Sequence, residues 1–341
     1  MYNNRGNSAC LSANALYDKR EKKPLFLFRI KKNNPLDKIK KIIEFLIDRN
    51  FVEYIYFEKA SNINSTIIFG NNYKDKYFKE FNKDNEDSNI CIIVGGDSTC
   101  LLANSLYDKR EKKPPFLCFQ GGKLGFLATH NPEDYENILT QIYTTENYKF
   151  IHRKEINCNV YEKDDKNNTT DDIKDFSDYK KVNSYTALNE LYLEKKANMS
   201  HLILFIEDNV LAKVSSDGVL FSSPTGSTAY SLSAGGPILH NGVDGIIITA
   251  ICPFSLSFRP IVLPQNKKLR VKNDKDFKDS LSLIRMDGFE KECLKDNQYI
   301  EVSLIDSSVD FITLENTEED LDKLWIEKIS KSLGWNYAFS H

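Results

Sequence analysis

Residues 90–107 read ICIIVGGDSTCLLANSLY, and this stretch decides the fold of the first half of the chain. Residues 90–94 form a short, uninterrupted apolar run, which is typical of a strand buried on both faces of a parallel sheet. A Gly-Gly turn follows at once, and the apolar spacing after it predicts a helix over residues 100–107. A strand, a glycine turn and a helix in direct succession predict an α/β unit.

The turn after this strand is a candidate phosphate-binding site. Backbone N–H groups at the start of a helix have no partner within the helix, and they lie at the positive end of the helix dipole. Such a turn binds anions, and phosphate is the anion that we expect here. The candidate phosphate-binding residues are Gly95, Gly96, Thr99 and, farther along the chain, Lys123.

Asp97 lies in the middle of this turn, where a carboxylate would repel a phosphate group. Its position at the carboxyl end of the strand indicates a general base, a hydroxyl acceptor or an indirect magnesium partner. The alternative is an ordinary helix N-cap, because aspartate is common at that position.

A second informative stretch, residues 222–237, reads SSPTGSTAYSLSAGGP. Its hydroxyl side chains donate and accept hydrogen bonds, and its glycines allow a ligand to approach the backbone closely. A Ser/Gly-rich linker is the alternative, but apolar residues border the run on both sides, so we interpret it as a polar binding loop.

Four segments occur in a fixed order: GGDST at 95–99, ALNE at 187–190, DG at 217–218 and SPTGSTAY at 223–230. Together they resemble the NAD kinases, and the resemblance extends over about residues 24–336. Segments LGFL and ICPFSLSFRPIV, at 124–127 and 251–262, also look like family segments.

The resemblance implies that the terminal phosphate of ATP is transferred to the 2'-hydroxyl of the adenosine ribose of NAD, giving NADP. Asp97 matches the family's general base, and magnesium is expected to arrive bound to ATP, with no metal site made of protein side chains. Asn189 and Glu190 match the dinucleotide-binding pair, and Asp217 matches a residue on the nicotinamide-riboside side. The remaining substrate-binding positions carried over are Gly96, Ser98, Thr225, Gly226, Thr228, Ala229, Tyr230 and Ser233.

Two residues depart from the family pattern. Ser98 stands where the family has glycine, and serine in a left-handed backbone would be strained by about 1–2 kcal/mol, so we expect reduced turnover that glycine would restore. Phe254 stands where the family usually has histidine.

The resemblance and the element pattern together predict an α/β amino-terminal domain with a Rossmann-like parallel sheet, followed by a carboxyl-terminal β-sandwich. Residues 24–148 form the first domain in this division, and residues 149–316 form the second. Residues 317–341 are expected to form a helix that packs back on the first domain. Residues 1–23 are expected to be a noncatalytic extension, because residues 8–27 nearly repeat 98–117 without the strand and the glycines.

The composition agrees with a two-domain enzyme acting on small molecules. The 341 residues carry a net charge of -3, which gives no general attraction to nucleic acid. No stretch is apolar and long enough to span a membrane, and the seven irregularly spaced cysteines indicate a reducing compartment, so we expect a cytoplasmic protein. The family resemblance implies a homo-oligomer, either a tetramer or a dimer.

Two alternatives to an active NAD kinase stay open. Ser98 could make the chain a catalytically weak NAD-binding regulator, and lipid kinases share the Gly-Gly-Asp turn. The absence of a Gly-x-x-x-x-Gly-Lys-Ser/Thr loop disfavours a P-loop kinase. The choices between NAD and NADH and between ATP and polyphosphate are open as well.

Overall fold

The computed structural model describes residues 24–28, 36–53, 55–57, 77–80, 89–107, 112–121, 125–163, 176, 178–277, 281–315 and 317–335. These residues form two compact units. The first unit holds the described residues up to Tyr107, Lys113–His152 and the described residues from Asp310 onward, and the second holds Arg153–Val309. Two long strands, β6 (Lys149–Lys163) and β17 (Gln298–Thr313), contribute residues to both.

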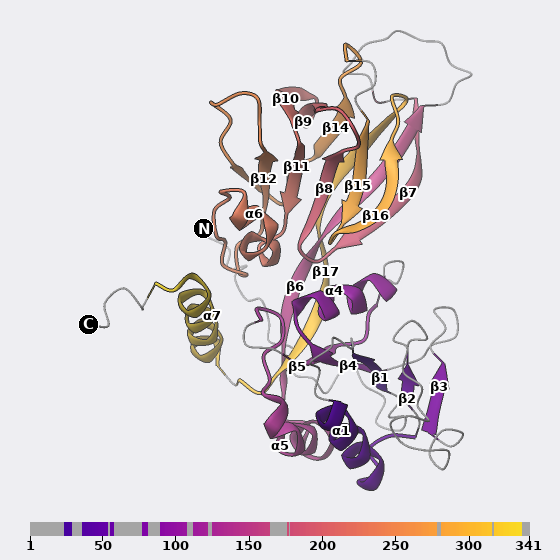
Figure 1. The fold of residues 1–341 in the computed structure, drawn as a ribbon, viewed down its shortest axis with the longest axis vertical. Helices are drawn as coiled ribbons and strands as arrows, with labels where there is room; N and C mark the ends of the chain where they lie inside the picture. The colour runs from indigo at the N-terminus through magenta and orange to yellow at the C-terminus, as the bar shows by residue number, and fades with distance from the viewer. Residues whose placement is uncertain are drawn as a thin grey trace, which may run out of the picture. The chain divides into compact units, whose positions relative to one another are not determined.

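The first unit contains a parallel sheet with the strand order β5-β4-β1-β2-β3 (Figure 1). Strand β4 is buried on both faces, as the uninterrupted apolar run in the sequence predicts, and β5 beside it is buried except at its last residue. The end of β17 joins this sheet in parallel beside β5. The strands are β1 (Pro24–Phe28), β2 (Ile55–Phe57), β3 (Phe78–Glu80), β4 (Ile90–Gly95) and β5 (Phe116–Gln120).

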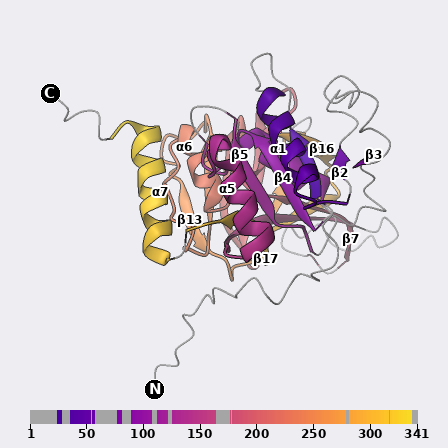
Figure 2. The ribbon, with the colours of Figure 1, turned by 90° about the horizontal axis from the view of Figure 1, so that it is seen from below.

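Helices cover both faces of this sheet. Helix α1 (Leu36–Asp48) lies beside α5 (Tyr135–Thr140), and the ring of Phe45 meets the ring of Tyr135 edge to face at 5.6 Å (Figure 2). Alternate strand residues, such as Ile92, pack with α1 and α5 in one core. On the other face Cys100 of α4 (Asp97–Leu106) contacts Cys118 of β5.

The carboxyl-terminal helix α7 (Glu318–Leu333) also belongs to the first unit. The side chain of Thr317 accepts a hydrogen bond from the backbone N–H of Asp320. In return, the side chain of Asp320 accepts a hydrogen bond from the backbone N–H of Thr317, which completes a capping box at the start of the helix. The helix ends at Gly334, which has a left-handed backbone.

The second unit is a β-sandwich. One sheet has the strand order β13-β12-β11-β8-β15-β16, and all of its pairings are antiparallel. Its strands are β8 (Glu190–Lys195), β11 (Gly218–Ser222), β12 (Gly245–Ile251), β13 (Ile261–Pro264), β15 (Ser282–Met286) and β16 (Phe289–Leu294).

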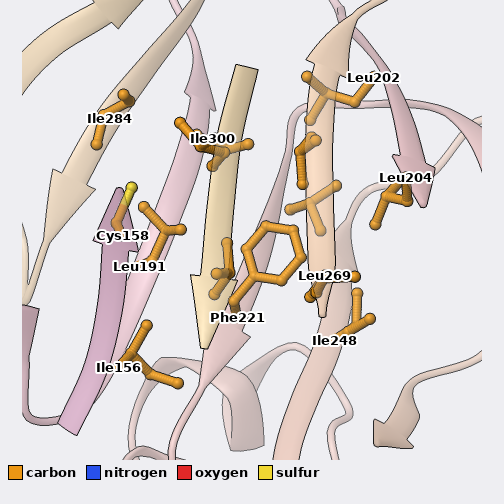
Figure 3. Close-up of a cluster of buried hydrophobic side chains, with 14 of the residues drawn as sticks. Ile156, Cys158, Leu191, Leu202, Leu204, Phe221, Ile248, Leu269, Ile284 and Ile300 are labelled. Atoms are coloured by element: carbon orange, nitrogen blue, oxygen red, sulfur yellow. The ribbon is translucent and has the colours of Figure 1, made fainter. Parts of the chain in front are cut away.

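The other layer of this unit has β10, β9, β14 and β17 in that order, with β6 between β17 and β7. Side chains from the two layers form one apolar core, in which Phe221, Leu269 and Ile300 are fully buried (Figure 3). The remaining strands are β7 (Tyr179–Ala187), β9 (Ser200–Ile206), β10 (Asn209–Ser216) and β14 (Leu269–Asn273).

The predicted combination of a parallel α/β unit and a β-sandwich is therefore confirmed, and two of its local predictions need correction. The helix predicted to begin at residue 100 begins at Asp97, directly after Gly96. The alternating apolar pattern over residues 187–193 predicts a strand, and that prediction is wrong in its extent, because a turn at Leu188 and Asn189 separates β7 from β8. Among the described helices, none combines the length and apolar composition needed to cross a membrane.

Candidate functional site

The first group of candidate residues lies at the carboxyl ends of β4 and β5. Gly96 connects β4 to α4 as the N-cap of the helix, with an extended backbone (φ -100°, ψ -174°) and no side chain capping the helix start. A β-carbon added at Gly96 would meet no atom of the described residues within 4 Å. The positive end of α4 therefore has open space beside it, as a phosphate site requires.

Asp97 is the first residue of α4, and its carboxylate faces a neighbouring loop. The backbone N–H of Phe126 donates to Oδ2 at 2.9 Å, and that of Leu127 donates to Oδ1 at 2.9 Å. The N-cap alternative for Asp97 is wrong, because Gly96 holds that position. A carboxylate oxygen can accept two hydrogen bonds, so the two amides hold the group in place and leave it acceptor capacity for a ligand.

Close glycine contacts hold this turn in position. A β-carbon at Gly95 would lie 2.4 Å from Oγ1 of Thr99, and one at Gly121 would lie 2.8 Å from the Cα of Gly95. The backbone N–H of Gly121 donates to the carbonyl oxygen of Gly95 at 2.9 Å. Larger residues at these positions would push the turn away from the end of β5.

The structure corrects the expectation for Ser98. This residue lies exposed in the first turn of α4, and it is not among the described residues with positive φ. The predicted left-handed strain is therefore absent, because a right-handed helical backbone accepts a β-carbon. Lys123 and residues 1–23 lie outside the described residues.

The second group lies in the β-sandwich unit and begins at the turn between β7 and β8. The carboxylate of Asp287 accepts hydrogen bonds from three consecutive backbone N–H groups of this turn, those of Leu188 (2.8 Å), Asn189 (2.7 Å) and Glu190 (3.2 Å). The N–H of Asp287 donates in return to the carbonyl oxygen of Glu190 at 3.0 Å. Asp287, in the hairpin between β15 and β16, therefore holds the turn between β7 and β8 in place.

Glu190 carries a buried carboxyl with unused hydrogen-bonding capacity. The residue is 8% exposed, and Oε2 has no hydrogen-bond partner within the described part of the chain. Loss of hydration, with the nearby charge of Asp287, raises the pKa of Glu190 to about 8. Burial likewise raises the pKa of Asp287 to about 6, although its three amide partners act in the opposite direction. A buried carboxyl of this kind favours a ligand that supplies a donor such as a ribose hydroxyl.

The hydroxyl-rich loop packs directly on this turn. A β-carbon at Gly226 would lie 2.0 Å from the carbonyl oxygen of Asn189, so only glycine fits there. The backbone N–H of Ser223 donates to the same carbonyl at 2.9 Å. On its other side, the guanidinium of the buried Arg153 donates to Oγ1 of Thr225 at 3.3 Å. The structure therefore brings together the candidate residues Asn189, Glu190, Thr225 and Gly226.

Asp217 lies on another part of the same sheet, at the start of β11. Its carboxylate pairs with Lys195 at 2.5 Å, and its carbonyl oxygen accepts a hydrogen bond from the Tyr192 hydroxyl at 3.3 Å. The Tyr192 ring meets the ring of Tyr230 edge to face, with 5.5 Å between centroids. These contacts link Asp217 to the loop through Tyr192 and the 41% exposed Tyr230.

The remaining candidates follow Gly226 on two short helices. Thr228 ends the 3-10 turn Thr225–Thr228 and donates to the carbonyl oxygen of Thr225 at 3.2 Å. Ala229 precedes the short helix α6 (Tyr230–Ser233), in which Ser233 is exposed. The side chains of Thr228 and Ala229 are half-buried, so all three positions retain surface that a ligand could contact.

Sequence reasoning missed several contributors to these two groups. Residues 285–288 resemble a family turn in the sequence, but the resemblance gives Asp287 no role; in the structure this left-handed aspartate (φ 49°) precedes a left-handed glycine (φ 82°) in the hairpin. No sequence signal identifies Tyr192 or Arg153, because their contacts join separate strands.

Comparison with known proteins gives consistent matches over both units. Residues 25–148 match the profile of the ATP-NAD kinase N-terminal domain, and residues 188–314 match the profile of the ATP-NAD kinase C-terminal domain. An ATP-NADH kinase of Saccharomyces cerevisiae is 31% identical over 311 residues, which cover 87% of this chain and 61% of that protein. NAD kinase 1 of Prochlorococcus marinus is 32% identical over 72% of this chain and 80% of that protein.

Solved structures agree with these matches. A yeast NADH kinase complexed with NADH superposes with a TM-score of 0.77 at 25% identity, over 93% of this chain and 88% of that one. An NAD kinase from Archaeoglobus fulgidus in complex with ATP has the same fold, with a TM-score of 0.60 at 19% identity over 89% of this chain and 98% of that one. The chain spans 59% to 63% of the length of three of the curated yeast and fission-yeast relatives that it matches.

Proposed function

The chain belongs to the ATP-NAD kinase family, and from that premise we propose that it transfers the terminal phosphate of ATP to the 2'-hydroxyl of the adenosine ribose of NAD. The observation that carries this proposal is the Asp97 carboxylate, held by two backbone amides beside the open N-terminus of α4. The carboxylate supports the role of proton acceptor and the helix start supports the role of anion site, and phosphoryl transfer to a hydroxyl needs both.

In the proposed reaction Asp97 accepts the proton of the 2'-hydroxyl. The ribose oxygen then forms a bond to the terminal phosphorus, and the bond from that phosphorus to the bridging oxygen breaks to release ADP. The backbone N–H groups of Gly96 and Ser98 at the start of α4 stabilise negative charge on the phosphates. The N–H of Thr99 already donates to the carbonyl oxygen of Gly96 at 2.8 Å, so Thr99 would contribute by holding this turn in place.

Magnesium would enter as the ATP complex. Within the described part of the chain, no group of three or more His, Cys, Asp or Glu residues is arranged to hold a metal. We expect the ion to be bound mainly by phosphate oxygens and water, with Asp97 as the neighbouring carboxylate. When bound, the ion would neutralise charge on the transferred phosphate.

The dinucleotide would bind through the β-sandwich unit. Asn189 and Glu190 are held in a fixed turn, and the unpartnered Oε2 of Glu190 supports an interaction with a ribose hydroxyl. We assign Asp217 to the nicotinamide-riboside side of the dinucleotide and Tyr230 to the adenosine side. Asp217 is already paired with Lys195, so it would accept a ligand hydrogen bond through its second oxygen. We also assign a substrate-binding role to five residues of the hydroxyl-rich loop: Thr225, Gly226, Thr228, Ala229 and Ser233. For the domain limits we propose residues 24–148 and 149–316.

The competing hypotheses receive less support. The weak regulator was based on strain at Ser98, and the helical backbone there removes that physical reason. The lipid kinase would leave the Asn189 turn and the loop packed on it without a role.

Self-association is a further part of the proposal. Phe254 is 78% exposed and Leu256 is 89% exposed in the loop between β12 and β13, although both are apolar. Adjacent apolar side chains of this exposure favour burial against another protein surface, and we propose a homo-oligomer, a tetramer or a dimer. Light scattering of the wild type and of a double Phe254→Ser, Leu256→Ser variant tests this, and a monomeric wild type would contradict it.

We also propose a cytoplasmic location for the chain. Some of its relatives are named as mitochondrial or chloroplastic proteins, so the location needs a direct test. Fluorescence microscopy of the tagged chain with organelle markers tests it, and co-localisation with mitochondria would overturn it.

The activity itself is tested with the purified full chain, Mg-ATP and either NAD or NADH, followed by measurement of NADP or NADPH. We expect product from the wild type and none above background from Asp97→Asn. Asp134→Asn, an exposed aspartate of the same unit, is the matched control and should retain activity. No product from the wild type, or phosphorylation of a sphingoid base or diacylglycerol instead, would refute the assignment.

A further inference from the structure

Lys328 on α7 contacts the loop that binds Asp97. Its Nζ donates to the carbonyl oxygen of Phe126 at 2.8 Å and lies 3.5 Å from that of Ala128. The side chain is half-buried, and all of these residues belong to the first unit.

One peptide group connects this lysine to Asp97. The carbonyl of Phe126 and the N–H of Leu127 belong to the same peptide unit. Its oxygen accepts from Lys328, and its N–H donates to Oδ1 of Asp97 at 2.9 Å. A positive charge at the oxygen end of a peptide polarises the group and strengthens its N–H as a donor.

The loop is fixed at further points beyond this peptide. The backbone N–H of Gln120 donates to the carbonyl oxygen of His130 at 2.8 Å. The backbone N–H of His130 donates to the carbonyl oxygen of Cys118 at 3.1 Å. The Nε2 atom of His130 lies 2.9 Å from the carbonyl oxygen of Ile312. His130 thus fixes the far end of the loop to β5 and β17, while Lys328 contacts the part that faces Asp97.

We propose that Lys328 is a positioning residue for Asp97, acting through the peptide between Phe126 and Leu127. The matched C-terminal profile ends at residue 314, before α7 begins at Glu318, so the family matches assign nothing to this lysine. The inference rests on the proposed role of Asp97 as general base. In this proposal the carboxyl-terminal helix α7 orients the Asp97 carboxylate in addition to stabilising the fold.

The test compares Lys328→Met, Lys328→Arg and a control, Lys323→Met, which removes an exposed lysine from the same helix. We expect Lys328→Met to lower kcat by about tenfold to a hundredfold, the loss expected from a misplaced catalytic group, with KM for NAD and for ATP within about twofold. Lys328→Arg keeps a cation at the carbonyl and should recover most of kcat. Lys323→Met should match the wild type.

A kcat for Lys328→Met equal to that of Lys323→Met would overturn the proposal. A fall in kcat accompanied by equal losses in both KM values and in Tm, with no recovery by Lys328→Arg, would also overturn it, because that pattern indicates a general structural role. A wild-type chain that makes neither NADP from NAD nor NADPH from NADH refutes the kinase assignment instead, so the two failures are distinguishable.

Discussion

A β-carbon added at Gly125 would lie 2.9 Å from Oδ1 of Asp97, the same oxygen that accepts the N–H of Leu127. The loop therefore approaches the carboxylate so closely that a side chain at position 125 would displace it. This relationship gives the glycine of the LGFL segment a physical role, which is to let two consecutive amides reach one carboxylate.

Gly125→Ala should consequently disturb the carboxylate more than the fold. We expect kcat for NADP formation to fall by about tenfold to a hundredfold, since a shift of roughly 1 Å in a reacting group has that effect. Steady-state kinetics and thermal melting check this together. Gly242→Ala, at a turn in the second unit, is the control and should change neither quantity. Full activity in Gly125→Ala would show that the contact is not needed.

Gly96→Ala tests the open space at the start of α4. Among the residues that the structure describes, none lies within 4 Å of the added β-carbon, and φ at this position is -100°, so the fold should lose less than about 1 kcal/mol. If phosphate approaches this backbone, the methyl group obstructs it, and KM for ATP should rise by about tenfold or more. An unchanged KM for ATP would place the phosphate elsewhere.

Ser98→Gly should not raise turnover. Serine at this position has a helical backbone, so glycine relieves no strain and instead weakens the first turn of α4 by about 0.5 kcal/mol. Chemical denaturation and kcat measurements on both proteins decide the question. A faster glycine variant would mean that the helix start changes when substrate binds.

Glu190 predicts a specific dependence of stability on pH. The folded protein retains the proton of this carboxyl up to its pKa of about 8, whereas the unfolded chain loses it near the ordinary value of 4.5. Between these values the unfolded state binds fewer protons, so the free energy of unfolding falls as pH rises, by up to about 1.4 kcal/mol per unit. Denaturation from pH 5 to pH 8 should show this decline, and Glu190→Gln should remove most of it. Equal slopes for the two proteins would contradict the buried, protonated carboxyl.

Asp287→Asn should impair NAD binding selectively. An amide has one acceptor oxygen, so the variant loses a partner for at least one of the three N–H groups of the Asn189 turn, at about 1–3 kcal/mol of stability. We expect KM for NAD to rise several-fold, while KM for ATP, which serves as the internal control, stays constant. Equal increases in both constants would indicate general loosening of the protein.

The local features of the fold were readable from the sequence because they depend on neighbouring residues. The apolar run before Gly95 predicts β4, and the helical spacing of apolar residues predicts α1 and α7. The start of α4 was placed three residues late, because hydrophobic spacing does not detect a polar first turn. The break between β7 and β8 was missed, because Leu188 continues the apolar pattern through a turn that Asp287 stabilises from elsewhere in the chain.

The family, the order of the motifs and the residue types that could bind a phosphate or accept a proton all follow from the amino-acid sequence. Only the tertiary structure decided that Asp97 receives amides from Phe126 and Leu127, and that Lys328 contacts the same peptide. It also decided that Ser98 is unstrained. The reason is physical: periodicity and turn chemistry depend on residues close in sequence, whereas these contacts join residues 29 to 202 positions apart and exist only once sheet and helices have packed.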